Sequence, residues 1–489
     1  MYLKSLTFNG ERKPFVKVLK IGEPYKATRK YNLLNVPGMA GSRITGYEDE
    51  PITIPVDIMI DANSKEQLEA RAEEVAYWLN VEAPAPLIFD KRPDRVRYAV
   101  VEGEMLPEEF VTFSKVTISF LCPASRKFSI EDTTQVIHDP DDDEEANPVV
   151  KVDGTAKTRP IFKATLTEDI TYLAIMNRDE YIAVGQPADP EAEVVERHTH
   201  VLDDSMGSTT GWGLTDNVTD GYVAGEIKAD GIRFYPENFG TAIAPLRWQG
   251  PALKKTIPQG PLKDFQMNAR IRNENIGWET GMLEVYLLNS KNEQVARIHI
   301  SDSWENMENI NCRVQLGIPG EDSRFVVITN SPSGKPKDWL NFDGIMTLQR
   351  EGNRWRLYFA VIDTKRDKRI HIYEKIYIDR DEIATDEITQ VQVAFRKWPN
   401  TRHTRMSIYH LNIWRINDVN EPQIPIIGKK GDVIEFDHVT NNITINGESL
   451  MEYKDLASDF FALQPGENEL AVYPANAAKV EVTKGDVYL

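Results

Sequence analysis

The chain consists mainly of short apolar runs separated by turn residues, but one stretch has the spacing of an α-helix. Apolar residues there recur at intervals of four, three, one and three positions, which places them in one stripe on a helix. They are Leu68, Ala72, Val75, Ala76 and Leu79. Ser64 and Gln67, just before them, have the spacing of a capping box. Since such a stripe must be buried, we expect this helix to pack on a sheet in an α+β domain.

The remainder of this first segment, residues 1–138, has the pattern of β-strands. The run from Ile52 to Ile60 alternates imperfectly between apolar and polar residues and predicts a strand, and Val116–Cys122 predicts another. Between the first apolar residues and these strands, the stretch 36–43 contains a proline and two glycines and predicts a projecting loop or arm. We therefore expect an N-terminal domain in which one helix covers a sheet.

A dense acidic run follows this domain. Six of the seven residues from Asp139 to Glu145 are acids. Like charges at this density repel one another, so the run predicts a solvated, extended linker over residues 139–146. A calcium loop is the alternative, but the run lacks the glycine and the distal glutamate of that motif.

From residue 147 onwards the pattern is all-β, and the distribution of tryptophan divides it. Eight of the nine tryptophans lie between residues 197 and 417, where strand-length runs alternate with Gly, Asn and Asp turns. This skew predicts an inserted jelly-roll or concanavalin-like β-sandwich. The strands of 418–489 alone are too few for a comfortable sandwich, so we expect 147–196 and 418–489 to fold together as one interrupted domain.

The overall composition restricts the class of protein. With 489 residues the chain has room for about three domains, and its formal net charge of −19 argues against nucleic-acid binding. Cys122 and Cys312 lie far apart and predict two buried thiols rather than a disulfide framework or a zinc site. No long apolar stretch predicts a membrane span, and the first residues do not predict a signal peptide. We expect synthesis in a reducing cytoplasm.

The sequence offers little support for catalysis. A glycoside hydrolase needs two carboxyl groups roughly 5–10 Å apart, and alternate residues of one strand would present them on the same face. Glu279 and Glu284 are five positions apart and are expected on opposite faces, as solvated or turn acids. No nucleophile elbow, zinc-protease motif or phosphate loop occurs. We therefore predict that the protein is not an enzyme.

Two further groups of residues have a possible binding chemistry. His198 and His200 lie near Asp203 and Asp204, which would suit a metal, but a polar linker at the edge of the insert is the preferred interpretation. No cofactor is predicted, and a calcium ion in the insert stays open because no local pattern fixes a site for it.

Non-catalytic sugar binding needs only an aromatic face and nearby polar groups. Four tryptophans lie near Gly, Asn, Asp or Pro, which favours loops or strand ends. These candidates are Trp212, Trp278, Trp304 and Trp398. Trp248, Trp355 and Trp414 lie within apolar runs and are expected in the core. Packing inside the domain is the alternative for the four candidates as well.

Three stretches resemble the distal tail protein family of long-tailed, siphovirus-type phages. In the first segment these are the loop Gly38–Arg43, the helix over 64–79 and the closing Phe120–Pro123. Asn147–Pro160 resembles the entry to the family's C-terminal domain, and Lys430–Asn468 resembles its closing signature. The resemblance implies N-terminal domains that form a homohexameric ring and a galectin-like β-sandwich as the C-terminal domain. It also implies that this ring lies between the tail tube protein and the tip or fibre-bearing hub protein.

The block over 197–417 is absent from minimal members and resembles the carbohydrate-binding-like insertions of so-called evolved distal tail proteins. The resemblance thus implies a virion component at the tail tip, made in the bacterial cytoplasm, whose insert binds host cell-wall saccharide. It implies neither specific nucleic-acid binding nor membrane binding. Two alternatives stay open: a secreted carbohydrate-active enzyme with accessory modules, and a purely structural ring whose insert contacts other tail proteins.

Overall fold

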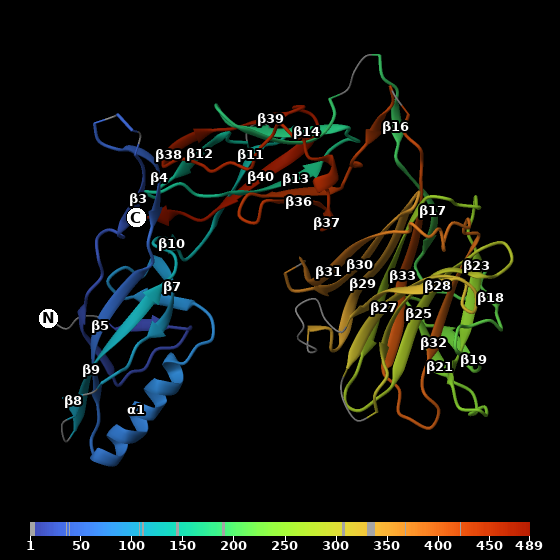
Figure 1. Cartoon of the computed structure of the whole chain (residues 1–489), viewed down its shortest axis with the longest axis horizontal. Helices are drawn as coiled ribbons and strands as arrows, with labels where there is room; N and C mark the ends of the chain where they lie inside the picture. The colour runs from blue at the N-terminus through green and yellow to red at the C-terminus, as the bar shows by residue number, and fades with distance from the viewer. Residues whose placement is uncertain are drawn as a thin grey trace. The chain divides into compact units, whose positions relative to one another are not determined.

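The computed structural model describes most of the chain, and its strands far outnumber its helices. The described residues are 5–35, 37–38, 40–106, 108–109, 112–142, 146–187, 191–305, 309–329, 338–366, 368–420 and 422–489. The chain divides into two compact units, of which the first joins Met1–Ala188 to Ile427–Leu489 and the second is Asp189–Ile426 (Figure 1). The predicted mainly β fold class is confirmed.

The N-terminal domain is a sheet with one helix packed on it. The sheet has the order β1-β6-β7-β9-β5-β2. Its strands are β1 (Leu6–Phe8), β2 (Val16–Ile21), β5 (Ile52–Asp61), β6 (Ala85–Phe89), β7 (Arg95–Glu102) and β9 (Phe113–Cys122), and β8 (Glu108–Glu109) pairs with β9. Alternate residues of β5 are buried, as in a strand with one face on a core.

Helix α1 (Lys65–Leu79) begins as the capping pattern predicts. The Gln67 backbone N–H donates to the Ser64 hydroxyl at 3.2 Å, and the Gln67 side chain accepts from the Asn63 N–H at 2.7 Å. The buried face differs in part from the predicted stripe, because Ala72 and Ala76 are exposed. The helix instead buries a tryptophan that the stripe did not include. The buried residues are Leu68, Val75, Trp78 and Leu79.

The predicted arm is a two-stranded hairpin. Strands β3 (Arg29–Leu34) and β4 (Arg43–Asp49) pair antiparallel, and they form a sheet of their own among the described residues. Residues 36 and 39 of the predicted loop lie outside the described residues. The Arg29 guanidinium donates to the Asp49 carboxylate through Nε at 2.6 Å and Nη2 at 3.0 Å, and Arg126 from the domain donates to the same carboxylate. The base of the hairpin is therefore tied to the domain.

The second domain of this unit is built from both sides of the insert. Strand β13 lies between β35 and β40, β14 pairs with β39, and β12 pairs with β38. The strands before the insert are β12 (Val149–Val152), β13 (Ile161–Leu166), β14 (Tyr172–Met176) and β15 (Tyr181–Gly185). Those after it are β35 (Val433–Asp437), β36 (Asn442–Ile445), β37 (Glu448–Ser449), β38 (Gly466–Glu469), β39 (Ala471–Tyr473) and β40 (Ala478–Lys484). One buried core joins residues of both segments, so the interrupted sandwich is a single domain.

The segment before residue 147 contributes more to this sandwich than its sequence predicts. Strand β11 (Thr133–His138) falls within the predicted N-terminal domain, but it pairs with β40 and its Ile137 lies in the core of the sandwich. Asp139 is buried and forms an ion pair with Lys479 at 2.8 Å, so the expected linker is not solvated at its first residue. Residues 143–145 of that linker lie outside the described residues. Strand β10 (Lys127–Ser129) also pairs with both β7 and the C-terminal β41 (Val487–Tyr488).

The second unit is a sandwich of two large antiparallel sheets (Figure 1). The eight-stranded sheet has the order β20-β21-β33-β24-β29-β30-β31, with β17 paired to β33. Its strands are β17 (His198–Asp204), β20 (Glu226–Ala229), β21 (Phe234–Asn238), β24 (Phe265–Glu274), β29 (Phe342–Glu351), β30 (Arg354–Asp363), β31 (Lys368–Ile378) and β33 (Arg405–Ile416). The opposite sheet has seven strands in the order β18-β23-β32-β25-β26-β27-β28. These are β18 (Gly213–Leu214), β23 (Ala252–Thr256), β25 (Gly281–Leu288), β26 (Gln294–Asp302), β27 (Ile310–Gly317), β28 (Ser323–Thr329) and β32 (Gln390–Arg396).

The largest buried core of the protein combines residues from both sheets of this unit. The fully buried side chains include Trp339, Trp355 and Phe265, which contact one another or neighbouring aromatic rings edge-on. Two short parallel pairs accompany the sheets. They are β16 (Val194–Glu196) with β34 (Ile424–Ile426), and β19 (Gly221–Val223) with β22 (Trp248–Gly250). The pair β16–β34 lies outside the predicted insert boundaries, 197 and 417. It lies inside the second unit, whose ends are 189 and 426.

Both cysteines are buried thiols, as predicted. Burial raises the pKa of Cys122 to about 11, so this thiol is protonated and unreactive at neutral pH. No helix among the described residues is long and apolar enough to span a membrane.

A buried histidine makes the interrupted sandwich sensitive to acid. His438 is fully buried against Phe162 and Phe461, and burial lowers its pKa to about 4 from an ordinary value of 6.5. Between these two pH values the unfolded chain binds a proton that the folded chain does not, so stability is lost as the pH falls from 6.5 towards 4. We expect this residue alone to account for about 3 kcal/mol of that loss.

We therefore expect the variant His438→Phe to lose markedly less stability than the wild type over this pH window. Hydrogen exchange of peptides from residues 149–185 is the suitable measurement, because no tryptophan lies in this domain to report on it. His138→Phe, at a half-buried position of the same domain whose ring contacts the Ala475 carbonyl, is the control. Equal acid sensitivity of wild type and His438→Phe would contradict the assignment.

Candidate functional site

The structure places one of the four candidate tryptophans in the core. Trp212 is only 9% exposed, its ring contacts Phe234 edge-on, and its indole N–H donates to the Asp204 carboxylate at 3.0 Å. Asp204 also accepts from Lys255 at 2.7 Å. Because the indole is enclosed and its polar atom already has a partner, its ring has no free face for a sugar. The prediction of Trp212 as a binding residue is wrong.

The other three candidates are exposed at one end of the seven-stranded sheet. They are Trp278 (66% exposed), Trp304 (54%) and Trp398 (37%). Trp278 precedes the start of β25, whereas Trp304 and Trp398 follow the ends of β26 and β32. Strand pairing brings these three strand ends together, since Gly281 lies opposite Asp302 and Met282 lies opposite Arg396. We call these three residues the tryptophan rim. Sequence alone predicted the residues but not that neighbouring strands would gather them.

The remaining tryptophans divide differently from the prediction. Trp355 is in the core as expected. Trp248 and Trp414 are half-buried rather than fully enclosed: Trp248 contacts the rim residue Trp398 edge-on at 6.0 Å between ring centroids, and Trp414 stacks on His200 at 4.8 Å. An apolar sequence context did not separate these two from core residues: Trp248 lies in the short two-stranded pair β19–β22, and Trp414 lies in β33 between β17 and β24. Trp248 therefore packs against one residue of the rim.

The loop that carries Trp278 is held by buried polar side chains. The Asn275 side chain accepts from the Gly277 N–H at 2.8 Å and donates to the Asp302 carboxylate at 2.5 Å. The Glu279 carboxylate accepts from the Ile276 N–H at 3.2 Å. Within this frame Trp278 has a φ of +48°, which bulky residues rarely adopt. Such strain persists only where the surroundings impose it, and it is a common feature of functional loops.

The two other rim loops share the same anchors. The backbone N–H of Trp304 donates to the Asp302 carboxylate at 3.3 Å, and the backbone N–H of Trp398 donates to the Thr280 hydroxyl at 3.1 Å. Thr280 and Asp302 are both buried. Asp302 thus holds both the Trp278 loop, through Asn275, and the backbone of Trp304, while Thr280 holds the backbone of Trp398.

Glu279 and Glu284 are buried, in contrast to the solvated positions expected for them. Glu279 accepts a hydrogen bond from Arg402 at 3.2 Å. Glu284 is fully enclosed and accepts from Arg396 Nη2 at 2.7 Å and from Arg297 Nη1 at 3.2 Å. Glu284 thus lies between two guanidiniums with no exposed surface, which leaves it out of reach of a proton on a bound substrate.

Two family models match this chain. The phage tail protein RIFT-related domain matches residues 9–122, and the C-terminal domain of the siphovirus-type tail component matches residues 402–484. They cover the N-terminal sheet and the returning half of the interrupted sandwich, in the order that the sequence resemblance predicts. The chain is a siphovirus-type distal tail protein.

Solved structures show weaker similarities to this distal tail protein. The CBM2 module of the evolved Dit of Lactobacillus casei BL23 phage J-1 is 16% identical, with 46% of this chain and 100% of that chain covered and a TM-score of 0.40. The Dit protein of phage SPP1 is 18% identical over 37% and 74% of the two chains, with a TM-score of 0.32. A glycosyl hydrolase family 16 protein of Mycobacterium smegmatis is 11% identical over 44% and 100%, with a TM-score of 0.30. A search of curated proteins gave no match. At these scores the structural similarities carry no argument about function.

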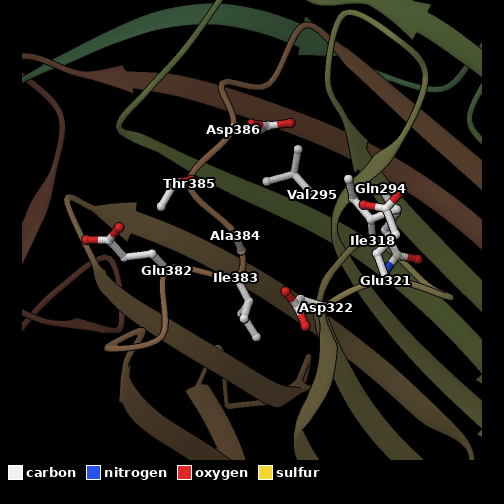
Figure 2. Close-up of a pocket in the computed structure, with 10 residues that line it drawn as sticks. All are labelled: Gln294, Val295, Ile318, Glu321, Asp322, Glu382, Ile383, Ala384, Thr385 and Asp386. Carbon is white, nitrogen blue, oxygen red and sulfur yellow. The ribbon is translucent and has the colours of Figure 1, made fainter.

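The distal tail protein also has a pocket of about 200 Å³ at the opposite end of the seven-stranded sheet, where β26 begins at Gln294. Figure 2 shows the acids on its wall, which are Glu321, Asp322, Glu382 and Asp386. One of them, Asp386, accepts from the Asn289 side chain at 2.7 Å. No group of three or more His, Cys, Asp or Glu residues that would hold a metal occurs in the part of the chain that the structure describes. We therefore do not assign a ligand to this pocket.

The histidines at the predicted insert edge are not in a linker. His198, His200, Asp203 and Asp204 belong to strand β17 of the eight-stranded sheet. Asp203 lies within hydrogen-bond distance of the His410 ring, at 2.5 Å, while Asp204 lies against Trp212. The sequence predicted a linker here because the pairing of β17 with β33 joins residues more than 200 positions apart and leaves no local signal.

The anchoring layer beneath the rim predicts a specific stability effect. The variant Asn275→Ala removes a donor to the buried Asp302 and should destabilise the second unit by about 1–3 kcal/mol. Urea unfolding followed by tryptophan fluorescence measures this, since eight of the nine tryptophans lie in the unit. Asn311→Ala, which removes one hydrogen bond of a half-buried side chain near the same end, should have a smaller effect. Equal effects of the two variants would show that Asn275 does not organise the rim.

Proposed function

We propose that this distal tail protein forms a homohexameric ring at the tail tip, between the tail tube protein and the tip or fibre-bearing hub protein. We further propose that its second unit adheres to host cell-wall saccharide through the tryptophan rim. The observation that carries the second proposal is the convergence of Trp278, Trp304 and Trp398 on one ordered edge.

The physical case for saccharide binding rests on exposure and order together. A large aromatic ring left in water is unfavourable, so three on one edge indicate a surface that a ligand covers. Aromatic rings stack on the apolar face of a sugar, and the exposed guanidinium of Arg402 beside Glu279 offers donors to its hydroxyls. Because the loops are already held by Asn275, Asp302 and Thr280, little conformational entropy is lost on binding.

The case for a ring rests on the hairpin of β3 and β4. Apolar side chains remain exposed along both strands, and the hairpin has no further strand beside it among the described residues. These residues are Tyr31, Leu33, Leu34, Ile44 and Tyr47. An isolated hairpin with exposed apolar residues is marginally stable and has free edges for pairing. A second copy of the chain, repeated by rotation until the ring closes, is the partner we propose.

A catalytic role for the second unit has less support. The faces of β25, β26, β27 and β32 that point away from the core carry a single carboxylate among the described residues, Glu284. Hydrolysis of a glycosidic bond requires two carboxyl groups that act as a pair. We therefore propose adhesion without hydrolysis, and a purely structural ring is the outcome if the saccharide test below fails.

The double variant Trp278→Ala/Trp304→Ala tests adhesion. We expect retention on purified host cell walls to fall at least tenfold, because each exposed ring contributes about 1 kcal/mol or more to stacking. Co-sedimentation of the full chain with the walls, over a range of protein concentrations, measures the affinity. Leu214→Ala removes an exposed apolar side chain elsewhere in the same unit and should leave retention unchanged. Unchanged retention of the double variant would rule out the rim as the adhesive surface.

The variant Leu33→Glu/Ile44→Glu tests the ring. Two charges on the hairpin should prevent the hexamer, since a buried unpaired carboxylate opposes the contact. Sedimentation equilibrium of wild type and variant measures the mass of the assembly. Leu106→Glu adds a charge at another exposed apolar position of the N-terminal domain and should leave the hexamer intact. A variant that assembles as the wild type does would show that another surface closes the ring.

A further inference from the structure

One face of the seven-stranded sheet points away from the core and is lined with polar residues that are nevertheless buried. Every residue of β25 and β26 is buried, although the positions that point away from the core include Glu284 and Tyr286 on β25 and Arg297, His299 and Ser301 on β26. We call this surface the polar face and define it by Glu284, Arg297, His299, Ser301, Arg313 and Arg396. Its register is set by the ladders, in which His299 lies directly between Glu284 on β25 and Arg313 on β27.

One side of the polar face is satisfied by the chain itself. The segment 215–223 lies over it, where Arg396 donates to the Thr219 carbonyl at 2.8 Å and Gln392 donates to the Asn217 carbonyl at 2.7 Å. The Tyr286 hydroxyl accepts from the Thr219 N–H at 3.3 Å. Glu284 is neutralised by Arg396 and Arg297, as described above. The polar side chains on the β32 and β25 half of the face therefore find their partners in the segment 215–223 and in the ion pairs of Glu284.

The other half has polar atoms without partners. Both ring nitrogens of His299 and the Ser301 hydroxyl are buried with no hydrogen bond, and so are the Nε atoms of Arg297 and Arg313. His299, Ser301 and Arg297 are each more than nine-tenths buried. Leaving such groups unpaired destabilises a fold by about 1–3 kcal/mol each, so their presence on one small surface points to something that binds there.

The chemistry of these groups indicates which ligand fits. Most of the unpartnered groups are donors, and the polar face holds three guanidiniums against one carboxylate. Burial, followed by the charges of Arg297, Arg313 and Arg396, holds the pKa of His299 well below its ordinary value. The imidazole is therefore neutral, and a bound anion would lie among donors with a net positive charge. This is a local exception in a chain whose formal net charge is −19.

We propose that the polar face around His299, Ser301 and Arg313 binds the oxyanion of an acidic saccharide, either a phosphate or a carboxylate. The inference rests on the proposed role of the second unit in saccharide binding and names the chemistry of the glycan. Its site is separate from the tryptophan rim: the rim contacts apolar faces of sugar rings, whereas the polar face takes the charged substituent.

Calorimetric titration of the full chain with glucose 6-phosphate, glucuronate and glucose tests this. We expect at least one acidic sugar to bind and glucose to bind at least tenfold more weakly. Binding of the phosphate ester alone or of the uronate alone identifies which oxyanion the site takes. Failure of both acidic sugars to bind, or equal binding of all three, would overturn the proposal.

Two variants connect this binding to the polar face. Arg313→Gln removes one charge at a half-buried position and should weaken acidic-sugar binding at least tenfold. Arg324→Gln makes the same change on the neighbouring strand, at an arginine that pairs with Asp381, and should have no effect. Thermal unfolding of both variants confirms that they fold. Acidic-sugar binding that is unchanged in Arg313→Gln would overturn the assignment.

An independent readout follows His299 itself. A bound anion should raise the pKa of this ring, and titration of its ring nitrogens by NMR with and without the acidic sugar measures the shift. A pKa that stays the same on saturation would place the anion elsewhere and overturn the proposal. Trp278→Ala/Trp304→Ala should keep acidic-sugar binding intact, so loss of wall adhesion through the rim and loss of the anion site are separate results.

Discussion

The backbone ladders that join β13 to β35 and β40 determine the organisation of this protein. They close one sandwich from segments that are separated by the whole second unit. Both ends of the insertion are held by hydrogen bonds to the residues just before β14, since the Gln186 N–H donates to the Thr171 carbonyl at 2.9 Å and the Ile427 N–H donates to the Ile170 carbonyl at 2.9 Å. Because the chain leaves and re-enters the sandwich at bonded positions, an insertion here does not interrupt its core.

Features that depend on neighbouring residues were predictable from the sequence. The start of α1 is an example, because Ser64 and Gln67 interact within one turn. The strands of the interrupted sandwich also follow from alternation and from the short length of each segment. Strand β11 was assigned to the wrong domain, since its pairing with β40 joins residues nearly 350 positions apart and has no local signal.

The candidate site was predictable only in part, for a related reason. Glycine and acid neighbours predicted a loop position equally well for Trp278 and for Trp212, but Trp212 finds a buried partner in Asp204. The polar face escaped prediction altogether. Glu284, Arg297 and His299 alternate with apolar residues, which is the usual pattern of a strand with one side in water. Only the segment 215–223, far away in sequence, shows that part of this side is covered.

The proposed ring would strengthen the proposed adhesion through the tryptophan rim. The rim is an edge rather than an enclosed pocket, and stacking on a few sugar rings gives weak affinity for a single site. In the proposed ring every copy of the chain carries the same rim, so one assembly presents several sites to a wall that repeats its sugars. Each further contact is then made at a high effective concentration, which strengthens attachment by a factor of about 10²–10⁴ without a new kind of contact. In the proposed function assembly and adhesion are therefore linked: the hairpin of the N-terminal domain would set how many rims act together, and each rim would bind through loops tied to buried side chains.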